Sequence, residues 1–148
     1  MIADAYCDPT AANPLPGLSD LEESAMYVKN ITDLPAARLP GIEHRTLAGP
    51  DDRLEQLSIW QQSLAPQART PRHQHDCEEV IVVLSGTGEL YIEGQVHGFC
   101  AGTTLVIPAG VTHEICATGT TAVQLIAAFP KARAGVFDMD GVPIELPW

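Results

Sequence analysis

The chain has 148 residues, which is enough for one compact domain with its own core. Hydrophobic residues make up 45% of it and charged residues 18%, a balance that excludes an intrinsically disordered chain. Its 8 basic residues stand against 19 acidic ones and give a formal net charge of −11. This charge argues against nucleic acid or an anionic membrane surface as a partner.

Residues 1–24 are polar and acidic, and we expect an N-terminal arm there, ahead of a single β-barrel domain over residues 25–148. The start of the chain has no basic region and no long apolar run, so it predicts no signal peptide and no membrane span. We therefore expect a soluble, cytoplasmic protein. The four cysteines form no C-x-x-C pair and are expected to be free thiols: Cys7, Cys77, Cys100 and Cys116.

Short segments with the composition of β-strands follow one another along the chain, and helical spacing is scarce after residue 30. The predicted strands are residues 25–31, 54–64, 79–84, 89–93, 103–107, 122–129 and 142–146. Glycine and proline pairs interrupt the chain between them, and residues 85–88 read as a tight turn. The pattern predicts an all-β protein, a closed or nearly closed sandwich.

Three of the five histidines fall in two short segments. His73 and His75 differ by two residues and Glu79 lies four further on, so a regular strand would turn all three to one face. An intervening loop would break this relation. Two imidazoles and one carboxylate make an incomplete metal site, and His113 is well placed to supply a fourth ligand from a distant segment.

The spacing resembles the two sequence motifs of the cupin superfamily. The first motif, H-x-H-x3-E-x6-G, is matched without a gap by His73, His75, Glu79 and Gly86. The second, G-x5-P-x-G-x2-H-x3-N, is matched by Gly102, Pro108, Gly110 and His113. Three turn or scaffold positions depart from the family pattern: Gln67, Thr103 and Ala117.

The resemblance implies a small single-domain cupin, with a jelly-roll-like β-barrel (a double-stranded β-helix) and a metal inside it. The ligand roles carry over to His73, His75, Glu79 and His113. Such a donor set suits one divalent transition metal per chain, namely Fe, Mn, Ni, Zn or Cu. Four protein ligands leave positions open on the metal for a substrate, water or dioxygen.

Several residues near the ligands in sequence have expected positions or roles of their own. Glu78 is expected on the opposite face from Glu79, and His44 and His97 are expected at the surface or in loops. Cys77 either lines the pocket or is a buried, inert thiol. Polar groups in apolar strands that could face the substrate are Gln61, Tyr91 and Gln124.

The leading functional hypothesis is a metalloenzyme that acts on a small oxygenated, metal-chelating substrate, with dioxygenase-type chemistry. One alternative is a zinc enzyme of the isomerase, lyase or polyketide-cyclase kind, and another is a non-catalytic small-molecule-binding cupin. Fold alone does not decide among them. The resemblance also implies a homodimer, since small cupins commonly pair through their sheets. The outward-facing Val80, Val82 and Leu84 give this a physical basis, because they must be covered by the N-terminal arm or by a partner.

Overall fold

The structure is a computed structural model and describes residues 27–147. The chain divides into two units, which meet in sequence at Leu34 and Pro35. The described part of the first unit holds a 3-10 helix, η1 (Ile31–Asp33), whose first turn is capped by the Asn30 side chain. Asn30 Oδ1 accepts a hydrogen bond from the Thr32 backbone N–H at 3.1 Å.

The strand predicted over residues 25–31 is wrong across its described part. Residues 27–30 form no strand, because the Asn30 cap turns the chain into η1 instead. The first two residues of that predicted strand, and the whole N-terminal arm at 1–24, lie outside the described residues.

The second unit is built from β-strands and confirms the all-β prediction. Its strands are β1 (Ala37–Leu39), β2 (Ile42–Ala48), β3 (Ser58–Leu64), β4 (Gln74–His75), β5 (Glu79–Ser85), β6 (Thr87–Ile92), β7 (Gln95–Cys100), β8 (Thr104–Ile107), β9 (His113–Ala117), β10 (Val123–Phe129) and β11 (Val136–Phe137). A 3-10 helix, η2 (Pro50–Asp52), lies between β2 and β3. Among residues 27–147, no helix has the length and apolar character needed to cross a bilayer.

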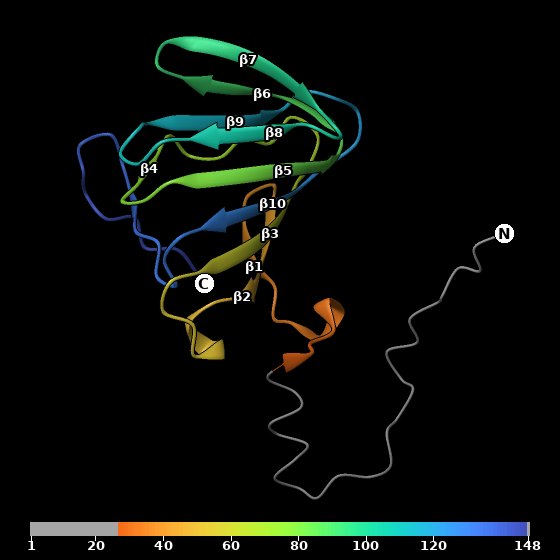
Figure 1. The fold of residues 1–148 in the computed structure, drawn as a ribbon. Coiled ribbons are helices and arrows are strands. Elements are labelled where there is room, and N and C mark those ends of the chain that lie inside the picture. Colours follow the sequence, from red (N-terminus) through yellow and green to blue (C-terminus); the bar gives the residue numbers. More distant parts are fainter. Residues whose placement is uncertain (1–26, 148) are drawn as a thin grey trace, which may run out of the picture. The chain divides into compact units, whose positions relative to one another are not determined.

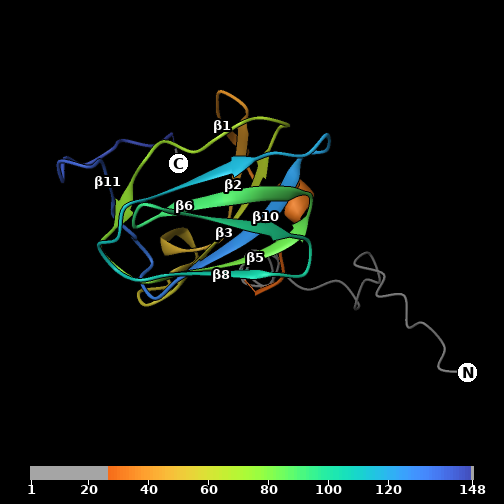
Figure 2. The ribbon, with the colours of Figure 1, turned by 90° about the horizontal axis from the view of Figure 1, so that it is seen from above.

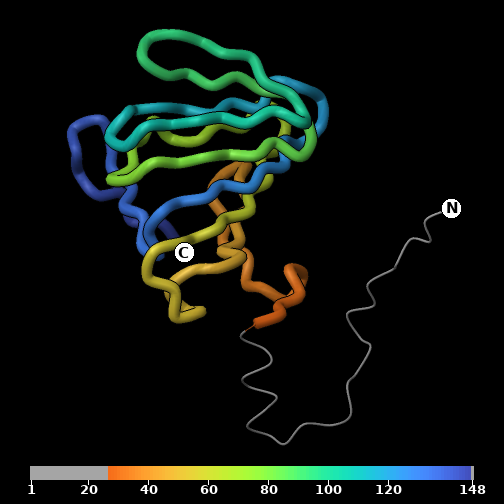
Figure 3. The backbone as a smooth tube through the Cα atoms, viewed as in Figure 1, coloured from red at the N-terminus to blue at the C-terminus, as the bar shows by residue number. Residues whose placement is uncertain are grey.

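The strands form a six-stranded sheet in the order β1-β2-β3-β10-β5-β8, a three-stranded sheet in the order β7-β6-β9, and the small β4–β11 pair. Figures 1 and 2 show the strands from two directions, and all the pairings are antiparallel. Strand β10 lies between β3 and β5, so Ala127 pairs with Trp60 on one side and Ile81 on the other. The backbone trace in Figure 3 shows how this late strand returns between two early ones.

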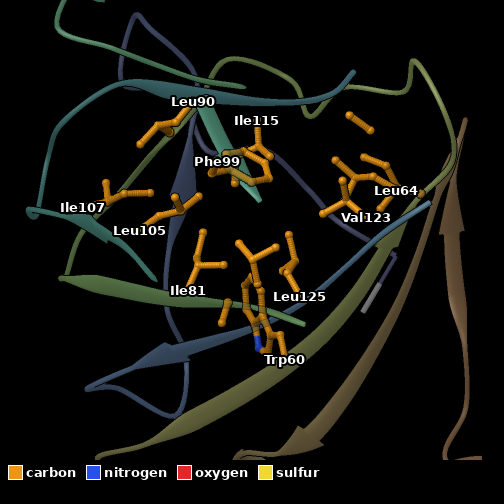
Figure 4. Close-up of a cluster of buried hydrophobic side chains, with 14 of the residues drawn as sticks. Trp60, Leu64, Ile81, Leu90, Phe99, Leu105, Ile107, Ile115, Val123 and Leu125 are labelled. Carbon is orange, nitrogen blue, oxygen red and sulfur yellow. The ribbon is translucent and has the colours of Figure 1, made fainter. Parts of the chain in front are cut away.

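The core of the second unit lies where the inner faces of the two larger sheets meet. Figure 4 shows Leu90 and Ile115 of the three-stranded sheet pointing into the same space as Ile81, Leu125 and Trp60 of the six-stranded sheet. Side chains on β5 alternate strictly between buried and exposed up to Leu84, as a strand with one solvated face requires.

Four of the predicted strands agree with the structure within a residue or two, and besides residues 25–31 two more differ by a greater margin. The strand predicted at 54–64 begins at Ser58, since Arg53 adopts a left-handed conformation (φ 62°) and the chain bends before β3. The strand predicted at 142–146 is wrong. Pro143 has no N–H to donate, and the segment makes one bridge, to Phe137 of β11, with a hydrogen bond from Ile144 N to Val136 O at 2.8 Å.

The tight turn predicted over residues 85–88 is shorter in the structure. Gly86 makes the reversal with φ 85°, and a Cβ there would lie 2.7 Å from the Ala122 carbonyl oxygen. The residues after it already belong to β6. The motif glycine therefore serves both the turn and the close passage of the chain before β10.

Two of the predictions for histidines differ in outcome. His97 lies on the exposed strand β7, as expected. His44, expected at the surface, is 1% exposed and faces the core from β2. Its ring packs edge-on against Trp60 at 5.1 Å between centroids and lies within hydrogen-bond distance of Thr46 Oγ1 (3.0 Å) and Gln62 Nε2 (3.3 Å).

Candidate metal centre

Four side chains from two segments of the chain converge at one point inside the second unit. His75 ends β4, Glu79 begins β5, His113 begins β9, and His73 bridges to His113 through two backbone hydrogen bonds of 2.9 and 3.1 Å. One potential ligand atom from each residue lies within 4.8 Å of the others. A loop does intervene between His75, where β4 ends, and Glu79, where β5 begins, so the convergence depends on this loop as well as on strand parity.

The three imidazoles are oriented by backbone carbonyl groups. Nδ1 lies 2.7 Å from Pro71 O in His73, 2.9 Å from Gly135 O in His75 and 3.0 Å from Val111 O in His113. A carbonyl oxygen can only accept a hydrogen bond, so each Nδ1 must carry the proton. Each Nε2 is therefore left with its lone pair available, which is the arrangement that a metal-ligating histidine needs.

Two atoms of this group are buried without a hydrogen-bond partner, namely Glu79 Oε2 and His113 Nε2. They lie 3.1 Å apart, and Glu79 Oε2 is 3.4 Å from His75 Nε2. Buried polar atoms in native proteins are normally satisfied, and the exceptions need an explanation. A cation bound between these lone pairs would satisfy both atoms, so the residues fit a divalent transition metal.

Burial also holds His73 and His75 in the form that binds metal. Desolvation, with the neighbouring His113 as a second cause, lowers the pKa of His73 to about 4. Desolvation likewise lowers the pKa of His75 below its ordinary value. Both rings are neutral at pH 7, so a metal does not have to displace a proton from either of them.

A cavity with a volume of about 40 Å³ lies against three of these ligands and is otherwise mostly apolar. Its remaining lining residues are Leu39, Ile42, Trp60, Gln62, Thr70, Pro71, Ile81, Ile115, Val136, Ile144 and Leu146. Thr70 Oγ1 already accepts a hydrogen bond from Ile115 N at 3.0 Å. Gln62 is therefore the polar side chain best placed to meet a ligand beside the metal centre.

None of the predicted pocket residues lines this cavity. Gln61 and Gln124 alternate with the inward-facing residues of β3 and β10, and Gln124 Nε2 donates to Ser63 Oγ at 2.8 Å. Tyr91 alternates with the buried Leu90 on β6, and its hydroxyl donates to Glu89 at 2.6 Å.

Two residues next to the ligands lie where the sequence placed them. Cys77 packs in the core, and burial raises the pKa of its thiol to about 11, which makes it unreactive. Glu78 is exposed, on the opposite side of the chain from Glu79.

Sequence reasoning missed three residues that line the cavity, namely Gln62, Ile144 and Leu146. Gln62 shares its strand parity with Trp60 and Leu64, both buried, so the alternation along β3 could have identified it in place of Gln61. Ile144 and Leu146 follow the last strand and carry no local signal that brings them to the metal centre.

The sequence model of the family described as "Auxin binding protein" matches residues 19–143. The chain belongs to the auxin-binding protein family. It is 35% identical over 123 residues to Auxin-binding protein 1 of Arabidopsis thaliana, an alignment covering 74% of this chain and 62% of that relative. It is 34% identical over 127 residues to Auxin-binding protein T92 of Nicotiana tabacum, covering 76% of this chain and 68% of the relative. The chain thus spans less than two thirds of the Arabidopsis protein.

Solved structures similar to this auxin-binding family member have the cupin fold. The polyketide cyclase RemF of Streptomyces resistomycificus aligns with a TM-score of 0.67 at 22% identity, over 76% of this chain and 84% of that one. An RmlC-like cupin from Shewanella frigidimarina aligns with a TM-score of 0.64 at 19% identity, over 72% and 92% of the two chains. These likenesses confirm the predicted cupin barrel and say nothing of activity.

Proposed function

We propose that this chain is a metal-dependent small-molecule-binding protein, with one divalent transition metal on His73, His75, Glu79 and His113. The observation that carries the proposal is the pair of buried atoms without hydrogen-bond partners, Glu79 Oε2 and His113 Nε2, in a group of four potential ligands. A bound metal would offer a cationic point to an anionic or carbonyl oxygen of the ligand.

The shape of the interior supports a ligand with a small polar head and an apolar body. About 40 Å³ beside the metal centre has room for a few water-sized groups, which suits a carboxylate but not a ring. A second hollow of about 300 Å³ shares Trp60, Val136, Ile144 and Leu146 with that cavity. An aromatic carboxylic acid would place its head in the first space and its ring in the second, and auxins such as indole-3-acetic acid have this form.

Binding is favoured over acid–base catalysis by what surrounds the centre. Among the described residues that line the cavity, the metal ligands are the sole titratable side chains. A zinc isomerase, lyase or cyclase needs a further acid or base within hydrogen-bond reach of the substrate, and Gln62 and Thr70 cannot act as one. Dioxygenase chemistry, which can proceed on a redox metal without such a group, stays a prediction.

The proposal is tested by metal analysis and calorimetry on the full chain. Protein purified without a histidine tag is expected to bind about one zinc or cobalt ion, and the metal-loaded form to bind indole-3-acetic acid. The double variant His75→Ala, His113→Ala should lose both metal binding and binding of indole-3-acetic acid. The variant His97→Ala, at an exposed histidine, should keep both. Failure of the wild-type protein to take up any divalent transition metal would overturn the proposal.

A homodimer is part of the proposed function. Val80, Val82, Leu84 and Val106 are 41%, 41%, 50% and 69% exposed on the neighbouring strands β5 and β8, and β8 is the edge of the six-stranded sheet. A second copy of the chain would cover this apolar face. Light scattering after gel filtration is expected to give twice the chain mass, and Val82→Lys to reduce it to that of a monomer. A wild-type monomer at all concentrations would exclude the dimer.

A further inference from the structure

A carboxylate outside the ligand set lies directly after His75. Asp76 Oδ1 accepts a hydrogen bond from Gly135 N at 2.9 Å, and Asp76 Oδ2 pairs with Lys131 Nζ at 2.5 Å. Lys131 lies near the start and Gly135 at the end of the short segment, residues 130–135, that connects β10 to β11. One side chain thus fastens both ends of this segment to the chain beside a metal ligand.

The same glycine also holds the ligand. Gly135 O accepts the hydrogen bond from His75 Nδ1 at 2.9 Å, while Gly135 N donates to Asp76. The surroundings leave no room for a side chain, because a Cβ on Gly135 would lie 2.5 Å from Phe137 Cε2 and 3.1 Å from Asp76 Cγ. Asp76 therefore fixes the backbone of Gly135, and the Gly135 carbonyl in turn fixes the position of the His75 imidazole.

His75 differs in this respect from the other two histidine ligands. His73 and His113 donate to carbonyls only two residues before them, at Pro71 and Val111, so the local backbone sets each acceptor. The acceptor for His75 is 60 residues away in sequence. Strand β11 pairs with β4 over only two residues. Other hydrogen bonds hold the start of the segment, from Ser58 Oγ to Lys131 O at 2.9 Å and from Ala132 N to Glu55 O at 3.2 Å, whereas Asp76 holds Gly135 itself.

We infer that Asp76 is a positioning residue of the metal centre, which sets the orientation and tautomer of His75 through the Gly135 carbonyl. This inference rests on the proposed metal binding. Outer hydrogen-bond partners of ligating histidines contribute about 10–100-fold to metal affinity. The loss of the Asp76 acceptor is expected to weaken metal binding within that range.

The test compares Asp76→Ala with Asp76→Asn on the full chain, titrated with cobalt(II) and followed by visible absorption. Asp76→Ala should weaken cobalt binding at least about 10-fold and alter the absorption bands at saturation. Asp76→Asn keeps an oxygen that accepts from Gly135 N, so it should restore most of the affinity and the wild-type spectrum. The matched control is Asp52→Ala. This substitution removes a similar hydrogen bond in the η2 turn, which Gly49 N donates to Asp52 Oδ2 at 3.0 Å.

The absorption spectrum at cobalt saturation distinguishes a positioning role from a simple loss of protein stability. A protein that is less stable but whose metal ligands are unchanged gives the wild-type bands once the site is filled. An Asp76→Ala protein with wild-type affinity and spectrum would overturn the inference, and so would an Asp76→Asn protein as weak as Asp76→Ala. Either result leaves the proposed metal binding intact, whereas a wild-type chain that binds no cobalt would overturn the proposed function itself.

Discussion

Replacing Glu79 by glutamine should move apo stability and metal affinity in opposite directions. Glu79 Oε2 and His113 Nε2 lie 3.1 Å apart, both buried and neither with a hydrogen-bond partner. An amide nitrogen in place of Oε2 would donate to His113 Nε2 with little movement. The substitution changes neither the size nor the shape of the side chain.

The size of the effect follows from the cost of a buried, unsatisfied polar atom, which is about 1–3 kcal/mol. The new hydrogen bond satisfies the imidazole nitrogen, so the free energy of unfolding of the apo protein should rise by about 1–3 kcal/mol. Metal affinity should fall by more than about 100-fold, because a direct anionic ligand is lost and even an outer partner is worth about 10–100-fold.

Urea unfolding in the presence of a chelator measures the first quantity, and cobalt titration measures the second. Glu78→Gln is the matched control, since the neighbouring carboxylate is exposed, and it should change neither quantity. An apo Glu79→Gln protein that is less stable than the wild type would refute the reasoning, as would unchanged cobalt affinity.

Two other regions give predictions. The pKa of His44 is lowered by burial to about 4 against an ordinary value of 6.5, so the unfolded chain binds the proton first as the pH falls. The apo protein should lose about 3 kcal/mol of stability from this group between about pH 6.5 and 4, and His44→Gln should show a shallower pH profile in urea unfolding; a parallel profile would contradict this. Leu146, half-buried where the two hollows share their lining, limits ligand size. Leu146→Ala should raise the calorimetric affinity of the metal-loaded protein for naphthalene acids relative to acetate, and an unchanged ratio would exclude that role.

The strands that sequence reasoning found are those with one apolar face, such as β5 and β10. Strand β7 was missed because its exposed residues give no hydrophobic alternation, and its pairing with β6 supplies the order instead. Strand β9 was missed for the opposite reason, since all five of its residues are buried and the period of two disappears. Local pattern identifies a strand only when its two faces differ.

The four residues of the metal centre could be named from motif spacing, because two short segments carry all of them. The pocket could not, because its walls depend on which strands lie opposite the centre. Gln61 was one of the predicted pocket candidates, whereas its neighbour on β3, Gln62, lines the cavity. His44 was predicted at the surface or in a loop, although pairing with β3 turns that side of β2 inward. The contribution of Ile144 and Leu146 depends on the path of the chain after β11, which no local periodicity encodes.

The three carbonyls that orient the histidines have a consequence for redesign. Since Pro71, Val111 and Gly135 act through their backbone oxygens, no side-chain exchange at these positions deletes an acceptor. Grafting the four ligands alone onto another barrel would transfer the donor atoms without the control of their tautomers. A transplant of this centre would have to carry whole stretches of main chain, together with the carboxylate that fastens the most distant of them.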